Sequence, residues 1–313
     1  MRFVVAHHNP VSCERWRNAL ARELPDAEVF IWNDGETREA DYAIAWAAPS
    51  AAFFARQKRL KAFFSTGAGV EKLLASSFMP AELPVVRLED AGMGNQMATY
   101  CVGAALQWIR QGEEYAEHQR AKAWQPLPRV DLADWPIGVF GLGVLGQQVA
   151  HAFAAVGFTV NGYSRSPHSM PGIRSFAESG GEGDFDAFLS ATRVLVILAP
   201  LTPQTLDRFD RDELGNLAPR SYVINVARGE LLVDEALLAL LDSGHLAGAA
   251  LDVFRQEPLP PEHRFWMHPK IRVTPHISAI TVIEPSARQV AQKVRSLERG
   301  EAISGVVERK RGY

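Results

Sequence analysis

A glycine motif between a predicted strand and a predicted helix constrains the fold of this chain more than any other feature. Residues 136–140 form an apolar run, and Gly141, Gly143 and Gly146 follow it in the spacing G-x-G-x-x-G. Apolar side chains then recur over residues 149–154 at helical spacing. Glycines here permit a tight turn and a close approach of the backbone to a pyrophosphate, and the helix N-terminus offers N–H groups and a positive dipole end. We interpret the motif as a dinucleotide-binding turn, the alternative being that the glycines serve only packing.

The end of the next predicted strand, residues 158–163, bears on which dinucleotide binds. A site for NAD usually carries an acidic residue there, which accepts hydrogen bonds from the ribose hydroxyls. This chain has Ser164, Arg165 and Ser166 instead. Without a carboxylate, nothing repels a 2′-phosphate, and Arg165 can pair with that phosphate. We therefore predict NADPH as the preferred cofactor, with NADH possible. The alternative is that Arg165 is only a solvated loop residue.

Short β-rich runs alternate with helical patterns along the chain, which predicts parallel sheets covered by helices on both faces. The predicted strands are 2–6, 28–32, 42–46, 61–65, 84–88, 136–140, 158–163, 193–198, 221–226, 248–253 and 271–274. The predicted helices include 13–23, 51–60, 101–112 and 285–303. Residues 113–134 are polar and contain two prolines, so we interpret them as a linker or arm.

Length and composition exclude several classes of protein. A chain of 313 residues is too long for one ordinary core, so we expect two domains. The net charge is −3, so no basic excess is available for nucleic acid or an anionic membrane. Cys13 and Cys101 are the only cysteines, too few for a disulfide framework or a cysteine-rich metal site. No signal-peptide or membrane-spanning pattern occurs, so we expect a cytoplasmic protein. No spacing of histidines and carboxylates suggests a metal site, so we expect none.

Three polar residues, Arg228, Glu257 and His276, each follow one of the last three predicted strands. Ligands of open α/β sheets bind beyond the carboxyl ends of the strands, where all three would lie. A histidine can donate a proton, a carboxylate can hold its ring, and an arginine can clamp a carboxylate and polarise a carbonyl. Beside a nicotinamide, these groups would reduce a 2-keto acid. Taken singly, the alternatives are a surface salt bridge, a solvated loop acid and a core histidine.

With these motifs the chain resembles the D-isomer-specific 2-hydroxyacid dehydrogenase family, and within it the bacterial glyoxylate/hydroxypyruvate reductase A type. The shared stretches cover nearly the whole chain: STGAGVEKL at 65–73, RLEDAGMGNQM at 87–97, WQPLP at 124–128, GLGVLG at 141–146, LAPLTPQT at 198–205, NVARG at 225–229, LDVFRQEPLP at 251–260, TPHISAIT at 274–281 and RGY at 311–313. One departure is Thr99, where many members of the family carry a glutamate.

The resemblance implies a particular α/β architecture, two doubly wound parallel-sheet domains. A Rossmann NAD(P)-binding domain is inserted into a flavodoxin-like substrate domain. We place the substrate domain at residues 1–98 plus 284–313 and the dinucleotide-binding domain at residues 99–283. The substrate is expected to enter the cleft between the two domains. The resemblance also implies a homodimer in which residues near 104–130 form an arm.

The resemblance assigns roles to single residues. Arg228 matches the arginine that orients the substrate, Glu257 the partner of the histidine, and His276 the general acid/base. Substrate binding is expected from Arg228, from Trp46 and from Ala68, Gly69 and Val70, whose loop of small residues presents N–H groups as an anion nest. The expected cofactor-binding residues are Gly141, Gly143, Val144, Leu145, Gly146, Ser164, Arg165, Ser166, Leu198, Ala199, Pro200, Thr202, Val226, Ala227 and Asp252.

Two further positions have simple alternatives. Trp46 ends a predicted strand and is expected to wall the substrate pocket, although a tryptophan there is more often a core residue. His7 and His8 end the first predicted strand, and we expect them at the edge of the cleft or on the surface.

The expected activity is NADPH-dependent reduction of small 2-keto acids, glyoxylate to glycolate and hydroxypyruvate to D-glycerate, with His276 as the proton donor. Two alternatives remain open at this point. One is a reductase of a bulkier 2-keto acid, because pocket size cannot be obtained from the residue order. The other is a non-catalytic dinucleotide-sensing protein of the same fold, because fold alone does not define activity.

Overall fold

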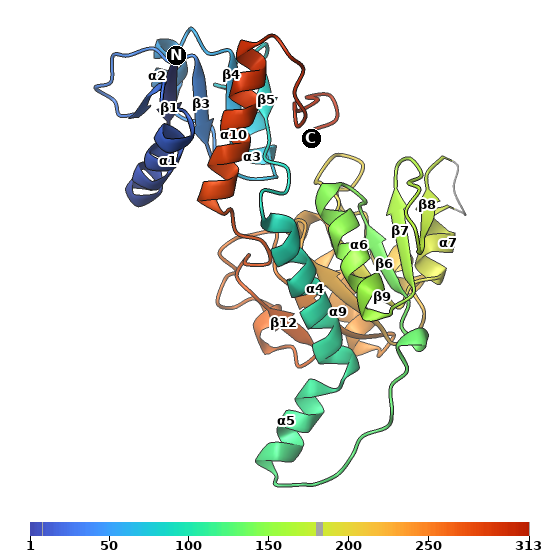
Figure 1. The fold of residues 1–313 in the computed structure, drawn as a ribbon. Helices are drawn as coiled ribbons and strands as arrows, with labels where there is room; N and C mark the ends of the chain where they lie inside the picture. Colours follow the sequence, from blue (N-terminus) through green and yellow to red (C-terminus); the bar gives the residue numbers. More distant parts are fainter. Residues whose placement is uncertain (8, 180–183, 313) are drawn as a thin grey trace. The chain divides into compact units, whose positions relative to one another are not determined.

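The computed structural model describes residues 1–7, 9–179 and 184–312, and their contacts divide the chain into two compact units (Figure 1). We call Met1–Met93 with Thr281–Tyr313 the terminal unit, and Gly94–Ile280 the central unit. One division falls at the first residue of a long helix, α4 (Met93–Ile109), and the other just before α10 (Ile283–Glu298). The domain limits expected from the sequence, 98/99 and 283/284, lie slightly further along the chain.

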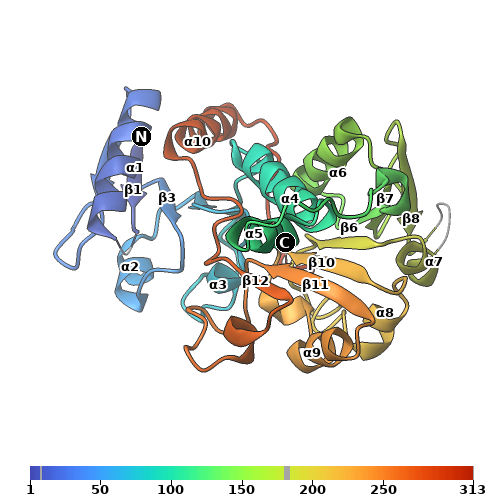
Figure 2. The ribbon, with the colours of Figure 1, turned by 90° about the horizontal axis from the view of Figure 1, so that it is seen from below.

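The terminal unit contains a five-stranded parallel sheet in the order β2-β1-β3-β4-β5, the order of a flavodoxin-like domain. The strands are β1 (Arg2–Val5), β2 (Glu28–Ile31), β3 (Tyr42–Ala45), β4 (Ala62–Ser65) and β5 (Val85–Val86). The helices are α1 (Pro10–Glu23), α2 (Ala51–Arg56), α3 (Glu71–Leu74) and α10. Helices α1 and α10 pack side by side (Figure 2).

Aromatic side chains fill both faces of this sheet because successive residues of a strand point in opposite directions. Phe63 of β4 packs against Phe53 and Phe54 of α2. The next residue, Phe64, packs instead against Tyr42 on the other face. There the hydroxyl of Tyr42 donates a 2.6 Å hydrogen bond to Glu298 at the end of α10.

The central unit contains a seven-stranded parallel sheet in the order β12-β11-β10-β9-β6-β7-β8. The strands are β6 (Ile137–Phe140), β7 (Val160–Ser164), β8 (Ile173–Ala177), β9 (Val194–Ile197), β10 (Ser221–Asn225), β11 (Leu246–Leu251) and β12 (Ile271–Val273). The helices are α4, α5 (Gly112–Arg120), α6 (Val144–Val156), α7 (Phe185–Ser190), α8 (Arg211–Gly215) and α9 (Asp234–Asp242), with short 3-10 turns at η1 (Leu132–Asp134), η2 (Gly229–Leu231) and η3 (Arg264–Met267). This order extends the Rossmann order by one strand. From β6 the chain adds β7 and β8 on one side and then β9 to β12 on the other, so the strand order reverses between β6 and β9.

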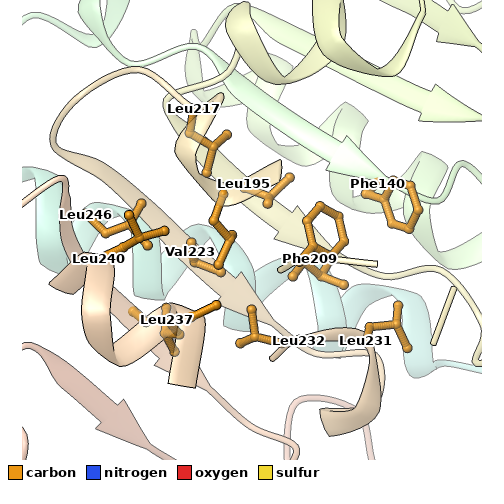
Figure 3. Packing of buried hydrophobic residues seen from close by; sticks show 14 of the residues in the cluster. Phe140, Leu195, Phe209, Leu217, Val223, Leu231, Leu232, Leu237, Leu240 and Leu246 are labelled. Carbon is orange, nitrogen blue, oxygen red and sulfur yellow. The ribbon is translucent and has the colours of Figure 1, made fainter. Parts of the chain in front are cut away.

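Each face of the central sheet has its own buried core. Helices α4 and α6 cover one face, with Cys101 and Phe153 packed among strand residues such as Val139. Helices α7, α8 and α9 cover the other face, where Leu195 and Leu237 lie in a cluster of leucines and phenylalanines (Figure 3). The predicted fold class, two parallel α/β sheets including a Rossmann domain, is confirmed.

Every predicted strand corresponds to an observed one, but several helices differ from their prediction. Helix α1 begins at Pro10, three residues early, because the side chain of Asn9 caps it by accepting a hydrogen bond from the N–H of Ser12. Helix α4 begins at Met93 rather than at residue 101. Strand β8 and helices α7 and α8 were not predicted.

Residues 113–134, interpreted as a linker or arm, begin with a helix that the sequence patterns do not predict, because α5 occupies residues 112–120. None of its side chains is buried, so it has no apolar stripe for a periodicity argument to detect. Its stability comes from other sources. Acidic Glu113 and Glu114 lie at its N-terminus, and basic Arg120 lies at its C-terminus, where each favours the helix dipole.

Candidate active site

The glycine turn lies where β6 ends and α6 begins, at the point where strand order reverses. Gly141 has a φ of +110°, and a Cβ there would lie 2.7 Å from the backbone N of Ala199. Only glycine fits this turn without strain. Gly143 caps α6, and no side chain accepts a hydrogen bond from the first turn of that helix. A Cβ at Gly143 would meet no described atom within 4 Å.

These features fit the pyrophosphate of a dinucleotide. Open space in front of Gly143 lets a phosphate approach the backbone, and the uncapped N–H groups of α6 are the donors it needs. At the end of β7, the Ser164 hydroxyl donates a 2.7 Å hydrogen bond to the carbonyl of Ser166, which folds the turn around Arg165. The side chains of Arg165 and Ser166 are exposed, as recognition of a ribose phosphate would need.

The other predicted cofactor residues lie at the same edge of the sheet. Val144 and Leu145 begin α6, while the remaining residues follow the carboxyl ends of β9, β10 and β11: Leu198, Ala199, Pro200, Thr202, Val226, Ala227 and Asp252. The β9 loop is folded by Thr205, whose Oγ1 accepts a hydrogen bond from the Thr202 N–H and donates one to the Pro200 carbonyl. These residues therefore lie where a dinucleotide would bind, and their contacts with a cofactor remain a prediction.

His276 and Glu257 are brought together by the structure. The distance from His276 Nδ1 to Glu257 Oε2 is 2.8 Å. The second carboxylate oxygen, Oε1, accepts a 3.0 Å hydrogen bond from the N–H of Phe254, so the loop backbone holds the carboxylate itself. About a third of each side chain is exposed, 36% for His276 and 32% for Glu257. The pair is therefore both oriented and accessible, as a proton donor with a fixed ring must be.

Arg228 lies in the loop that follows β10, the neighbour of β11 in the sheet. The buried side chain of Asn225 shapes this loop by accepting from the N–H of Ala227 and donating to the carbonyl of Arg228. A Cβ at Gly229 would overlap the backbone of Phe254, so this loop packs directly on the loop that leads to Glu257. The three predicted catalytic residues thus occupy adjoining loops at one edge of the sheet.

Asp252 has a structural function that the sequence did not indicate. Its side chain is fully buried. Oδ1 accepts hydrogen bonds from the Thr274 hydroxyl (2.6 Å) and the Ile277 N–H (2.9 Å), and Oδ2 accepts one from the Ser278 N–H (2.8 Å). Asp252 therefore fixes the segment that carries His276.

The predicted carboxylate-binding loop belongs to the terminal unit and follows β4. Within the described part of the chain, the N–H groups of Ala68, Gly69 and Val70 donate no hydrogen bond to another backbone group, as donors that bind an anion would require. The loop is braced by Ser65, whose Oγ accepts from the Gly67 N–H. Trp46 is 37% exposed, and a Cβ at Gly67 would lie 2.7 Å from its ring. The core interpretation of Trp46 is therefore wrong, since its ring lies on this loop.

Sequence reasoning missed two residues of α4 that contact the His276 segment, Gln96 and Tyr100. Gln96 forms two hydrogen bonds with the backbone of Ile280, and the Tyr100 hydroxyl lies 2.6 Å from Thr274 Oγ1. Their spacing of four residues places both side chains on one face of the helix, which the sequence could indicate. The residues that they contact lie more than 170 positions away, so the sequence could not indicate their partners.

Other predicted features can be placed briefly. His7 is partly buried at the end of β1, whereas His8 and Tyr313 lie outside the described residues. Among the described residues, no cluster of histidine, cysteine and acidic side chains could hold a metal ion. In the same residues, no helix has the length and apolar character needed to cross a membrane.

Comparison with known proteins defines the class. Residues 102–278 match the family model described as D-isomer specific 2-hydroxyacid dehydrogenase, NAD binding domain. The chain belongs to this family of oxidoreductases, which confirms the resemblance noted in the sequence and the expectation of a nicotinamide dinucleotide cofactor.

Solved structures agree over the full length. A D-isomer specific 2-hydroxyacid dehydrogenase from Xanthobacter autotrophicus, solved with NADPH and MES, is 33% identical with a TM-score of 0.91, covering 99% of both chains. An NADPH-dependent glyoxylate/hydroxypyruvate reductase from Sinorhizobium meliloti, solved with NADP and sulfate, is 34% identical with a TM-score of 0.90, covering 100% of this chain and 99% of that one. A probable 2-hydroxyacid dehydrogenase from Rhizobium etli, solved with NADP, HEPES and tartaric acid, is 31% identical with a TM-score of 0.88, covering 100% and 99%.

Proposed function

We propose that this protein reduces small 2-keto acids with NADPH, glyoxylate to glycolate and hydroxypyruvate to D-glycerate. The observation that carries the proposal is the 2.8 Å pair of His276 and Glu257 at the sheet edge that also bears the glycine turn. The similarity to the Sinorhizobium reductase supports this choice of substrates and cofactor.

Each residue of the proposed site has a defined role. Bound NADPH supplies a hydride for C2 of the keto acid. His276 donates a proton to the carbonyl oxygen, so that the C=O double bond becomes a C–O single bond while a C–H and an O–H bond form. Glu257 holds the imidazole ring in a fixed orientation. Arg228 binds the substrate carboxylate and polarises the carbonyl, and the N–H groups of residues 68–70 are further donors for the carboxylate.

The preference for NADPH rests on the end of β7. The residue after Tyr163 is a serine rather than an acidic residue, and Arg165 is exposed, so its guanidinium can pair with a 2′-phosphate. We expect the double variant Arg165→Asp, Ser166→Ala to lose far more catalytic efficiency with NADPH than with NADH. Steady-state rates with each cofactor measure this. An equal loss with both cofactors would contradict the assignment.

The activity itself is tested by the loss of absorbance at 340 nm. Glyoxylate, hydroxypyruvate and phenylpyruvate are each supplied with NADPH and with NADH. Fast oxidation of NADPH with the two small acids is the expected result. Turnover of phenylpyruvate alone would keep the mechanism and replace the substrate. Tight NADPH binding without any turnover would favour a dinucleotide sensor.

We also propose that the protein is a cytoplasmic homodimer, with the segment that includes α5 as an arm. Helix α5 buries none of its side chains within one chain, and Trp124 is fully exposed beyond it. A large aromatic side chain left in water is typical of a surface that another chain covers. Sedimentation equilibrium should give twice the mass of one chain, and Trp124→Ser should weaken the dimer. A monomeric wild-type protein would contradict the proposal.

A further inference from the structure

Two side chains of α4 hold both ends of the segment that carries His276. Gln96 and Tyr100 are four residues apart, so they lie on one face of the helix. The Gln96 side chain donates to the Ile280 carbonyl at 2.9 Å and accepts from the Ile280 N–H at 3.2 Å. Tyr100 reaches the other end of the segment, at Thr274.

The direction of the Tyr100 hydrogen bond follows from counting protons. Thr274 has a single hydroxyl proton, and it donates this proton to the carboxylate of Asp252, which is an acceptor. Tyr100 must therefore donate to Thr274. Burial raises the pKa of Tyr100 to about 12, so the hydroxyl keeps its proton near neutral pH.

The segment between these two ends has a strained backbone that needs such support. His276 has a φ of +55°, a conformation that residues other than glycine adopt at a cost. Its N–H donates to the Asp252 carbonyl at 2.8 Å, and the Asp252 carboxylate accepts from the next two N–H groups. A strained residue persists only where its surroundings over-determine it, and here hydrogen bonds fix the segment at its start, middle and end.

We propose that Gln96 and Tyr100 are positioning residues, which orient His276 by clamping the segment Thr274–Ile280 to α4. They act through the backbone of that segment and through Thr274 and Asp252. The proposal rests on the proposed role of His276 as proton donor.

The variants Tyr100→Phe and Gln96→Met test the clamp, since each removes hydrogen bonds and little volume. Tyr222→Phe is the matched control, because the buried hydroxyl of Tyr222 in the same unit has no hydrogen-bond partner among the described residues. Two readouts are needed. One is the hydrogen exchange of peptides that span residues 274–280, measured by mass spectrometry without cofactor. The other is steady-state kinetics with the best substrate.

In Tyr100→Phe and in Gln96→Met, we expect faster exchange in this segment. Tyr100→Phe loses one hydrogen bond and Gln96→Met loses two. We also expect kcat to fall by about 3- to 10-fold, the size of effect that weakened hydrogen bonding has, with KM within about twofold of wild type. The control should match wild type in both readouts. Exchange that stays unchanged overturns the clamp, whatever the activity. Faster exchange with unchanged kcat overturns the positioning role. A wild-type protein without reductase activity refutes the proposed function instead, and the exchange data still decide whether the clamp exists.

Discussion

At the scale of single residues, the carboxylate of Glu257 shows how the site is held. One of its oxygens faces the His276 ring and the other accepts from the Phe254 N–H. The ring is therefore oriented by a group that is itself fixed to the backbone of its loop. Both residues keep about a third of their side-chain surface exposed, so this fixing does not close the site to a ligand.

Removal of the proposed proton donor should abolish most of the activity. We expect His276→Ala to lower kcat by roughly 10²- to 10⁴-fold, the usual contribution of a general acid. The rate of NADPH oxidation with saturating keto acid measures this. His151→Ala, which changes an exposed histidine of α6, should behave as wild type. Near wild-type activity of His276→Ala would refute the assigned role.

Loss of the ring's partner should lower the rate. In Glu257→Gln the His276 ring loses the carboxylate that lies 2.8 Å from its Nδ1. The proposed proton donor is then held less firmly, so kcat for keto acid reduction should fall, by less than the roughly 10²- to 10⁴-fold expected for His276→Ala. The rate of NADPH oxidation with saturating keto acid measures this. A kcat equal to that of wild type would argue against a functional pair.

At the scale of elements, the glycines of the turn before α6 have separable functions. Gly141 has a φ of +110° and touches the β9 loop, whereas Gly143 has an ordinary φ of −69° and faces open space. The first glycine is needed by the fold, and we infer that the second is needed by the ligand.

Alanine at these two positions should therefore give opposite results. Gly143→Ala should leave the thermal unfolding temperature nearly unchanged but weaken dinucleotide binding by about 10- to 100-fold, because the phosphate loses charge-assisted hydrogen bonds. Gly141→Ala should destabilise the fold by at least about 1–3 kcal/mol, because its backbone conformation is strained for alanine. Calorimetry and fluorescence titration with NADPH separate the two effects. Normal dinucleotide affinity in Gly143→Ala would refute the proposed binding turn.

At the scale of the whole molecule, hydrogen bonds within the terminal unit join the segment near residue 90 to the last part of the chain. The buried ammonium group of Lys293 on α10 lies 2.8 Å from Glu89 Oε2 and donates to the carbonyl of Ser304. The Ser304 hydroxyl donates to the same Glu89 oxygen, and Gln289 pairs with the Glu89 backbone. A segment near residue 90 thus fastens the last helix and the tail that follows it.

This cluster should make stability depend on pH. Burial alone raises the pKa of Glu89, but hydrogen bonds from Lys293 and Ser304 outweigh it, and the pKa lies below the ordinary 4.5. A carboxyl whose pKa is lowered by folding stabilises the native state above its ordinary pKa, and that stabilisation is lost as the pH falls below about 4.5. The urea midpoint of wild type should therefore exceed that of Glu89→Gln at pH 7, with the gap narrowing by pH 3. Glu82→Gln, at an exposed position, is the control. A gap independent of pH would contradict the assigned cause.

The local patterns of the chain were sufficient for the class of fold and for placing three candidate site residues at one edge of a sheet. Strand periodicity, the glycine spacing and the residues after each strand end are short-range signals, and in a parallel sheet the strand ends meet at one edge. The positions of Arg228, Glu257 and His276 could therefore be predicted before any coordinates, whereas their catalytic roles are a proposal.

Features that depend on contacts between distant residues emerged only in three dimensions. Helix α5 has no buried stripe, the buried carboxylate of Asp252 holds a segment more than twenty residues away, and Gln96 reaches Ile280 across 184 positions. Packing likewise decides two features of the loop after β4. The Gly67 N–H donates to Ser65 Oγ, and the Trp46 ring lies against Gly67. Hydrogen bonding and burial are decided by which groups the folded chain brings together, and residue order encodes such partners only through the whole fold.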